Sequence, residues 1–447
     1  YKAYGPDGCQ MTDDAAAIVY DEIQKTDILT GAKYMSFAEG VEEGLIRFVG
    51  DDCKRALYDA IESRQVRPGL CKTAGLKLVY SPLNGSGLVP VTQILKDIGI
   101  TDVTIVPEFD EQGVACYRLE GGDYLNEYYI VSEAESRKLL NTPEIVGYEV
   151  YNCLIPSTSQ MLYYLKEQKK VTTANILSIL RGALNYPLEE SCYREHIRVH
   201  DISFLSSERV FADEEIAGLE IKYSKLTMVP DSTLMIGDII ASGETLIHCL
   251  RYVTDFYRKN GARLRNIIVF TIGGTKGIDI LEELTKDIRK FWPDFEGFIT
   301  IYYEGIFSTY QDKGVSGINL PDVDFFWKDG IVAPEFRRET LSMCSPLFEK
   351  CIIYDGGARR YEIHEHVEEV LDFWKGMLAR ADRIDMAELL AEKLGYPLPI
   401  SYEDWITCNH YENIPAADTR WLYRQEQGYI ESMKNITLEE LATRRIE

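Results

Sequence analysis

The stretch from Thr233 to Leu246, with the sequence TLMIGDIIASGETL, constrains the fold of this chain more than any other. Leu234, Met235 and Ile236 form a short apolar run, which is typical of a strand covered on both faces. Small residues then leave the backbone bare enough for several N–H groups to converge on one anion, and a helix follows. The sequence therefore predicts a buried strand, a phosphate-binding turn and a helix, within a doubly wound and mostly parallel α/β sheet.

The turn and the acid that precedes it together predict the ligand. Asp238 lies near the carboxyl end of the predicted strand, and a carboxylate beside a phosphate repels it unless the carboxylate binds sugar hydroxyls or a metal. Both features fit a ribose phosphate. An ordinary glycine-rich strand-to-helix turn without a ligand is the alternative. The residues predicted to hold the phosphate are Ala241, Ser242, Gly243, Glu244 and Thr245.

Charge and cysteine usage narrow the partners and the compartment. The 447 residues carry a formal net charge of −24, and nucleic acids or anionic membranes bind through excess Lys and Arg, so we expect neither as a partner. The ten cysteines form no Cys-x-x-Cys pair, and the chain has no secretory segment or 18-residue apolar run. A reduced, cytoplasmic protein is the simplest interpretation. A homo-oligomer stays open.

The Thr233–Leu246 stretch resembles the 5-phosphoribosyl 1-diphosphate (PRPP) motif of the type I phosphoribosyltransferases, and is most similar to the uracil-type members. Gly237 stands where the motif has the first of two acids, and uracil-type enzymes also keep only one acid there. The resemblance implies transfer of the 5-phosphoribosyl group from PRPP to a nitrogen nucleophile, such as a nucleobase, with release of diphosphate. It also implies Mg²⁺ bound with PRPP, for which no protein ligand is assigned.

Two further segments resemble parts of the same family. Arg181 and Gly182 follow the apolar run Ile176–Leu180 and resemble its diphosphate loop, where the paired donors of an arginine suit diphosphate. Lys225 lies in a segment that resembles the strand beside the mobile active-site loop. The resemblance implies that Lys225 closes over the diphosphate; an exposed hairpin lysine is the alternative.

The nucleobase side of the resemblance is incomplete. The pyrimidine-reading loop of the uracil-type enzymes, Gly-Asp-Ala-Gly-Asp-Arg, does not occur in the chain. At the corresponding place Asp322 and Asp324 could accept hydrogen bonds from a base. A strand-edge turn without a binding role is the favoured alternative for these two residues.

Residues 1–108 carry a second resemblance. Their segments Tyr1–Thr12, Leu76–Gly87 and Ile100–Glu108 look like the central part of an alpha-D-phosphohexomutase. The sequence motif that carries this family's catalytic serine, and its Asp-Gly-Asp metal-binding loop, do not occur in the chain. A mutase needs its phosphorylated nucleophile and its cation together, so the resemblance implies a βαβ fragment without activity.

Four regions follow from these patterns. They are a mutase-like α/β fragment (1–108), a junction (109–123), a phosphoribosyltransferase-like domain (124–335) and a mainly helical C-terminal region (336–447). A joining of two unrelated genes near residue 109 also explains the two resemblances. Besides the transferase, two functions stay open: a non-catalytic sensor of PRPP or a nucleotide, because Gly237 replaces an acid, and an inactive phosphohexomutase fragment.

Overall fold

The computed structural model describes most of the chain. Contacts between residues divide it into two compact units, Tyr1–Glu108 and Phe109–Glu447. Of the residues singled out above, Arg181, Gly182, Asp322 and Asp324 lie outside the described part. The residues outside it are 1–8, 26–34, 36–39, 41–42, 48–49, 81–86, 106–113, 181–183, 185, 213–214, 310–313, 319–324, 344, 350–355, 415–418 and 434–435.

The first unit is a small α/β unit. Its two described strands are parallel, with a helix between them in the chain, because the short apolar runs flank an amphipathic segment. This βαβ arrangement agrees with the one expected from the sequence, while the mutase resemblance stays a prediction. The described elements are α1 (Asp13–Gln24), α3 (Asp51–Glu62), α4 (Leu70–Thr73), β1 (Lys77–Tyr80), α5 (Leu88–Ile98) and β2 (Asp102–Ile105).

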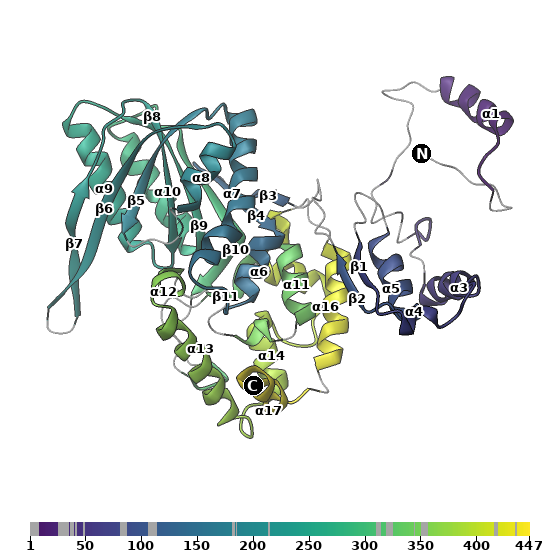
Figure 1. The fold of residues 1–447 in the computed structure, drawn as a ribbon. Helices are drawn as coiled ribbons and strands as arrows, with labels where there is room; N and C mark the ends of the chain where they lie inside the picture. Colours follow the sequence, from purple (N-terminus) through teal and green to yellow (C-terminus); the bar gives the residue numbers. More distant parts are fainter. Residues whose placement is uncertain are drawn as a thin grey trace. The chain divides into compact units, whose positions relative to one another are not determined.

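A nine-stranded sheet forms the centre of the second unit (Figure 1). Its strand order is β3-β4-β10-β9-β8-β5-β6-β7, and β11 pairs with β10. The six strands from β4 to β6 in this order are parallel, and β3, β7 and β11 are antiparallel to their neighbours. The strands are β3 (Val114–Arg118), β4 (Glu127–Glu133), β5 (Thr173–Leu180), β6 (Arg198–Ala212), β7 (Glu215–Lys225), β8 (Ser232–Ile240), β9 (Leu264–Gly274), β10 (Gly297–Thr309) and β11 (Phe325–Val332).

Helices cover both faces of this sheet, as a doubly wound fold requires. On one face, Tyr128 of β4 hydrogen-bonds Glu282 of α10 (2.9 Å). On the other face, Tyr303 of β10 lies 2.6 Å from the hydroxyl oxygen of Thr158 in α7. The helices that cover the two faces are α6 (Ala134–Asn141), α7 (Tyr148–Lys169), α8 (Tyr186–Arg194), α9 (Glu244–Lys259) and α10 (Lys276–Arg289). The predicted α/β fold is therefore confirmed.

The C-terminal part of the second unit is helical, as the sequence predicts. A fully buried ion pair joins it internally: Arg337 of α11 donates to the carboxylate of Glu426 in α16 (2.6 and 2.8 Å). Its helices are α11 (Pro334–Met343), α12 (Gly356–Tyr361), α13 (Ile363–Leu378), α14 (Met386–Leu394), α15 (Tyr402–Cys408), α16 (Thr419–Met433) and α17 (Leu438–Ile446), with 3₁₀ turns at Pro346–Phe348 and Tyr411–Asn413.

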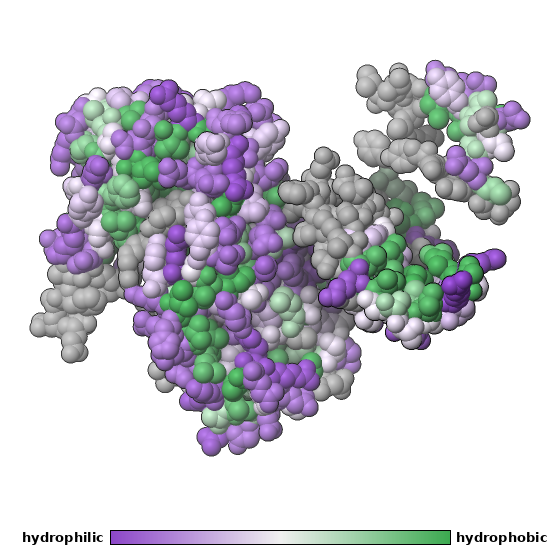
Figure 2. Space-filling model, viewed as in Figure 1, coloured by the Kyte–Doolittle hydropathy of each residue, from purple (hydrophilic) through white to green (hydrophobic). Residues whose placement is uncertain are grey.

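Burial follows the sequence pattern. The run from Ile267 to Phe270 in β9 is fully buried, because β9 has a strand on each side and helices on each face. Hydrophilic residues cover most of the visible surface of the second unit, and hydrophobic residues form scattered patches there (Figure 2). Every cysteine in the described part is a free thiol. No described helix combines the length and the apolar character needed to cross a membrane.

Candidate functional site

The predicted strand–turn–helix forms at the carboxyl edge of the sheet. Strand β8 extends through Gly237 and Asp238 to Ile240, so the acid lies two residues inside the strand end. Gly237 is buried and Asp238 is half-buried. In the turn that follows, Ser242 is exposed, Ala241 is partly exposed and Gly243 is buried. The first part of the turn is therefore open to a ligand.

Gly243 gives the turn its shape. Its φ of +76° lies in the left-handed region that favours glycine, and it is the N-cap residue of α9. A Cβ atom at this position would lie 3.0 Å from Cδ1 of Ile280 in α10. As a glycine, Gly243 has no side chain that could cap the first N–H groups of the helix. The positive end of this 16-residue helix therefore faces the turn and favours an anion there.

Asp238 is the acid at this edge. One of its carboxylate oxygens accepts a hydrogen bond from the N–H of Ile239 (2.9 Å). Its charge also reaches α9: burial and, to a smaller extent, Asp238 raise the pKa of the Cys249 thiol to about 12. Asp238 therefore lies on the side of the sheet that α9 covers, and it is half-buried.

Two hydroxyl groups that the sequence did not single out lie in the same row of the sheet. Asp238 pairs with Thr271 of β9, which pairs with Tyr302 of β10, so the three side chains share one face. Thr271 and Tyr302 are fully buried. Among the described residues, neither hydroxyl oxygen has a hydrogen-bond partner. A threonine inside the apolar run Ile267–Ile272 was the available signal.

The strand next to β8 ends at the same edge. Leu177 of β5 pairs with Ile236 of β8, so Leu180 at the end of β5 is level with Ile239. The described end of β5 therefore lies beside the end of β8, one strand spacing of about 4.8 Å away. Arg181 and Gly182 are outside the described part, so their role in holding diphosphate stays a prediction.

Lys225 is placed elsewhere in the sheet. It is exposed near the end of the edge strand β7, where it pairs with Phe204 of β6. Strands β6 and β5 separate β7 from β8, so its backbone is roughly 14 Å from that of β8 at about 4.8 Å per strand. The described structure does not bring Lys225 to Asp238. The hairpin of β6 and β7 does extend beyond the end of β5, as Figure 1 shows.

Backbone packing explains the two glycines at the end of β9. A Cβ atom at Gly273 would lie 3.1 Å from the carbonyl oxygen of Ile240, and one at Gly274 would lie 3.3 Å from that of Phe307. These glycines allow neighbouring strands to end close together. Within the described ranges, no three His, Cys, Asp or Glu side chains group closely enough to hold a metal ion.

The fold and the site define a doubly wound α/β protein whose sheet presents an open strand–turn–helix at its carboxyl edge. No protein-family model and no curated protein matches the chain. Solved structures that it resembles include the AQ2163 protein from Aquifex aeolicus, with a TM-score of 0.28 and 18% identity over 39% of this chain and 86% of that one.

Two further solved structures are phosphoribosyltransferases. The hypoxanthine-guanine phosphoribosyltransferase of L. donovani has a TM-score of 0.25 and 15% identity, over 31% of this chain and 78% of that one. The hypoxanthine phosphoribosyltransferase of Trypanosoma cruzi has a TM-score of 0.23 and 12% identity, over 32% of this chain and 67% of that one. At these values the likenesses carry no argument about activity.

Proposed function

We propose that the protein is a Mg²⁺-dependent phosphoribosyltransferase that uses PRPP. The observation that carries the proposal is the β8–α9 turn: a partly exposed turn and a helix start with a glycine N-cap follow a half-buried aspartate. A helix start attracts a phosphate, and the aspartate repels one unless sugar hydroxyls lie between them. A sugar phosphate satisfies both groups at once.

Each group has a defined task in the proposed reaction. The N–H groups of Ala241 to Thr245 hold the 5-phosphate, and Asp238 accepts hydrogen bonds from the ribose hydroxyls. Arg181 binds the diphosphate. A nitrogen nucleophile then forms a bond to C1 of the ribose while the bond from C1 to the diphosphate oxygen breaks, and the electron pair leaves with diphosphate. The site accelerates the reaction by holding both ends in line and stabilising the leaving charge.

The residues at this edge fit a Mg²⁺ ion that arrives with PRPP. Mg²⁺ is commonly bound by one or two carboxylates together with waters and substrate phosphates, and Asp238 is a half-buried carboxylate at the turn. Bound there with PRPP, the ion would neutralise part of the diphosphate charge. The net charge of −24, from 72 acidic against 48 basic side chains, makes such neutralisation useful.

The experiment is a diphosphate-release assay with PRPP, Mg²⁺ and a panel of nucleobases. We expect turnover by the wild-type protein and a loss of about tenfold or more in Asp238→Asn, the size expected when a hydrogen bond to a charged group is removed. Asp279→Asn, an exposed aspartate in the first turn of α10, is the matched control and should keep full activity. Equal turnover in wild type and Asp238→Asn would reject the assigned role.

A second candidate is a non-catalytic sensor of PRPP or a nucleotide. Two observations favour it: Gly237 stands in place of an acid, and Lys225 lies three strands from β8. Calorimetry with PRPP and Mg²⁺ separates the two candidates. Tight binding without turnover of any acceptor supports the sensor, and turnover excludes it.

A further inference from the structure

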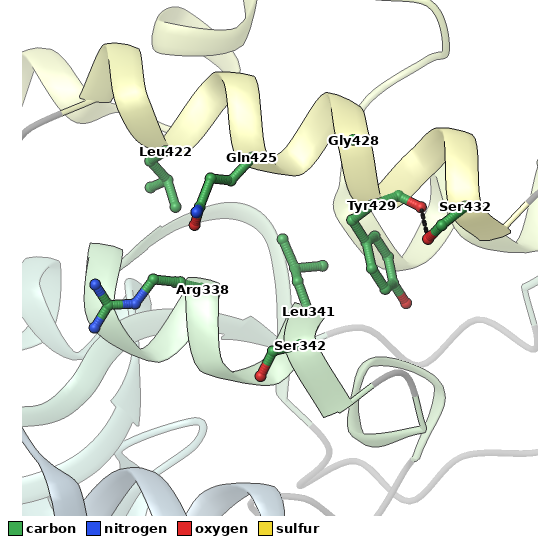
Figure 3. A pocket seen from close by; sticks show the side chains of 8 residues that line it. All are labelled: Arg338, Leu341, Ser342, Leu422, Gln425, Gly428, Tyr429 and Ser432. Atoms are coloured by element: carbon green, nitrogen blue, oxygen red, sulfur yellow. Dashed lines mark hydrogen bonds between the residues drawn. The ribbon is translucent and has the colours of Figure 1, made fainter. Parts of the chain in front are cut away.

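A groove between helices α11 and α16 forms a second candidate site, which shares no residue with the β8–α9 turn. Its cavity has a volume of about 390 Å³. Figure 3 shows the side chains of both helices facing each other across it. The lining residues are Arg338, Leu341, Ser342, Leu422, Gln425, Gly428, Tyr429 and Ser432.

The floor of the groove is apolar. Leu341, Leu422 and Tyr429 are all at most 9% exposed, and they line the space between the two helices. Gly428 leaves part of one wall open, since a Cβ atom there would meet no atom within 4 Å. A glycine inside a helix costs about 1 kcal/mol relative to alanine. Nothing in the described chain fills the space that this glycine leaves.

One end of the groove carries a cation. Arg338 is exposed, and its guanidinium carbon lies 5.4 Å from the centre of the Trp421 ring. Among the described residues, no carboxylate forms an ion pair with Arg338, although the chain as a whole is strongly acidic. The side chain of Gln425 extends from α16 at the same end (Figure 3). This end therefore offers a positive charge and an amide to a ligand.

The opposite end of the groove is neutral, and its two serine hydroxyls already donate to backbone carbonyls. The hydroxyl of Ser342 donates to the carbonyl of Glu339 (2.7 Å), and that of Ser432 donates to the carbonyl of Tyr429 (2.7 Å). The span from Gln425 to Ser432 along α16 is about 10 Å at about 1.5 Å per residue. The groove thus combines one cationic end with an apolar length and a neutral far end.

We propose that this groove binds an aliphatic monocarboxylate of about the length of decanoate. The carboxylate pairs with Arg338 and accepts a hydrogen bond from the Gln425 amide, and the chain lies over Leu341, Leu422 and Tyr429. An arginine binds a planar carboxylate through two parallel hydrogen bonds, and the apolar floor accounts for the chain. A phosphate ester without a chain would leave that floor empty, so the chemistry favours the amphiphile.

The test is titration of the full-length protein with decanoate, decylammonium and acetate, by calorimetry and by tryptophan fluorescence. We expect decanoate to bind. Decylammonium, which lacks the carboxylate, and acetate, which lacks the alkyl chain, should each bind at least tenfold more weakly. The fluorescence change should disappear in Trp421→Phe while the heat of binding remains, since Trp421 packs on Arg338.

Four variants locate the binding. Arg338→Gln should weaken decanoate binding about tenfold or more, consistent with the loss of a charged hydrogen-bond partner, and Arg424→Gln, an exposed arginine of α16 outside the groove, should not. Gly428→Leu should block the groove, whereas Gly428→Ala should keep it. The proposal is overturned if decanoate does not bind, if Arg338→Gln and Gly428→Leu bind it as the wild type does, or if Gly428→Leu instead dissociates a dimer of this chain.

Discussion

Glu304 is a buried carboxyl group at the point where strand β10 bends. Its φ of +63° is unusual for a residue other than glycine, and the pairing of β10 with β9 shifts register around it. The N–H of Glu133 (3.0 Å) and the hydroxyl of Ser136 donate to one of its oxygens, so the side chain supports the start of α6. Its complete burial raises its pKa to about 8 from an ordinary value of 4.5.

The raised pKa predicts a pH dependence of stability. Between about pH 4.5 and pH 8 the folded state binds this proton more tightly than the unfolded state, so the free energy of unfolding falls as pH rises through that window. Glu304→Gln should remove this part of the fall, whereas Glu167→Gln, an exposed residue of α7, should not. Urea unfolding at pH 5, 6, 7 and 8 measures it. Parallel curves for wild type and Glu304→Gln would contradict the assignment.

The conformation of Gly243 predicts a second effect at the residue scale. Gly243→Ala should lower the free energy of unfolding by about 1–2 kcal/mol, because an alanine is strained in the left-handed backbone conformation. Crowding of its Cβ atom against Ile280 should lower it further. Gly261→Ala is the matched control, because Gly261 also has a positive φ (+71°) but a Cβ there would meet nothing. Urea denaturation of both variants measures the difference. Equal losses would show that Ile280 moves aside freely.

At the scale of elements, the ion pair of Arg337 and Glu426 holds α11 against α16. Both side chains are fully buried, and Asn409 (2.6 Å) and Tyr396 complete their hydrogen bonds. Glu426→Gln leaves a buried arginine uncompensated and should cost about 3–5 kcal/mol. Glu431→Gln, an exposed residue of the same helix, should change the free energy of unfolding little. A loss below 1 kcal/mol in Glu426→Gln would mean that water reaches Arg337.

Local patterns predicted the elements well because apolar runs and helical periodicity depend on near neighbours. The apolar runs Ile176–Leu180 and Leu234–Ile236, which the sequence singled out, lie within the strands β5 (Thr173–Leu180) and β8 (Ser232–Ile240). The order of the strands depends on packing between distant segments, which no local pattern records. Lys225 illustrates this: six residues separate it from β8 in the chain, yet β5 and β6 lie between them in the sheet.

The candidate site was predictable to the same extent. The turn and Asp238 form one continuous segment, so their arrangement follows from local sequence. Thr271 and Tyr302 join the row of Asp238 only through the register of three strands, and the sequence gives no register for parallel neighbours. Residues carried by separate strands therefore required the structure.

For the whole molecule, the two compact units predict that the second folds alone. Its sheet, both helical layers and the Arg337–Glu426 pair all belong to residues 109–447. A protein of those residues should unfold cooperatively in urea and bind PRPP as tightly as the full chain. Circular dichroism and calorimetry provide the two measurements. An unfolded fragment would show that residues 1–108 contribute to the core.

The most direct test of the central claim is a crystal structure of the full chain with PRPP and Mg²⁺. We expect the 5-phosphate within hydrogen-bond distance of the N–H groups of Ser242 to Thr245, with the Asp238 carboxylate hydrogen-bonded to the ribose hydroxyls. A phosphate bound away from this turn, or an Asp238 carboxylate that does not reach the sugar, would contradict it.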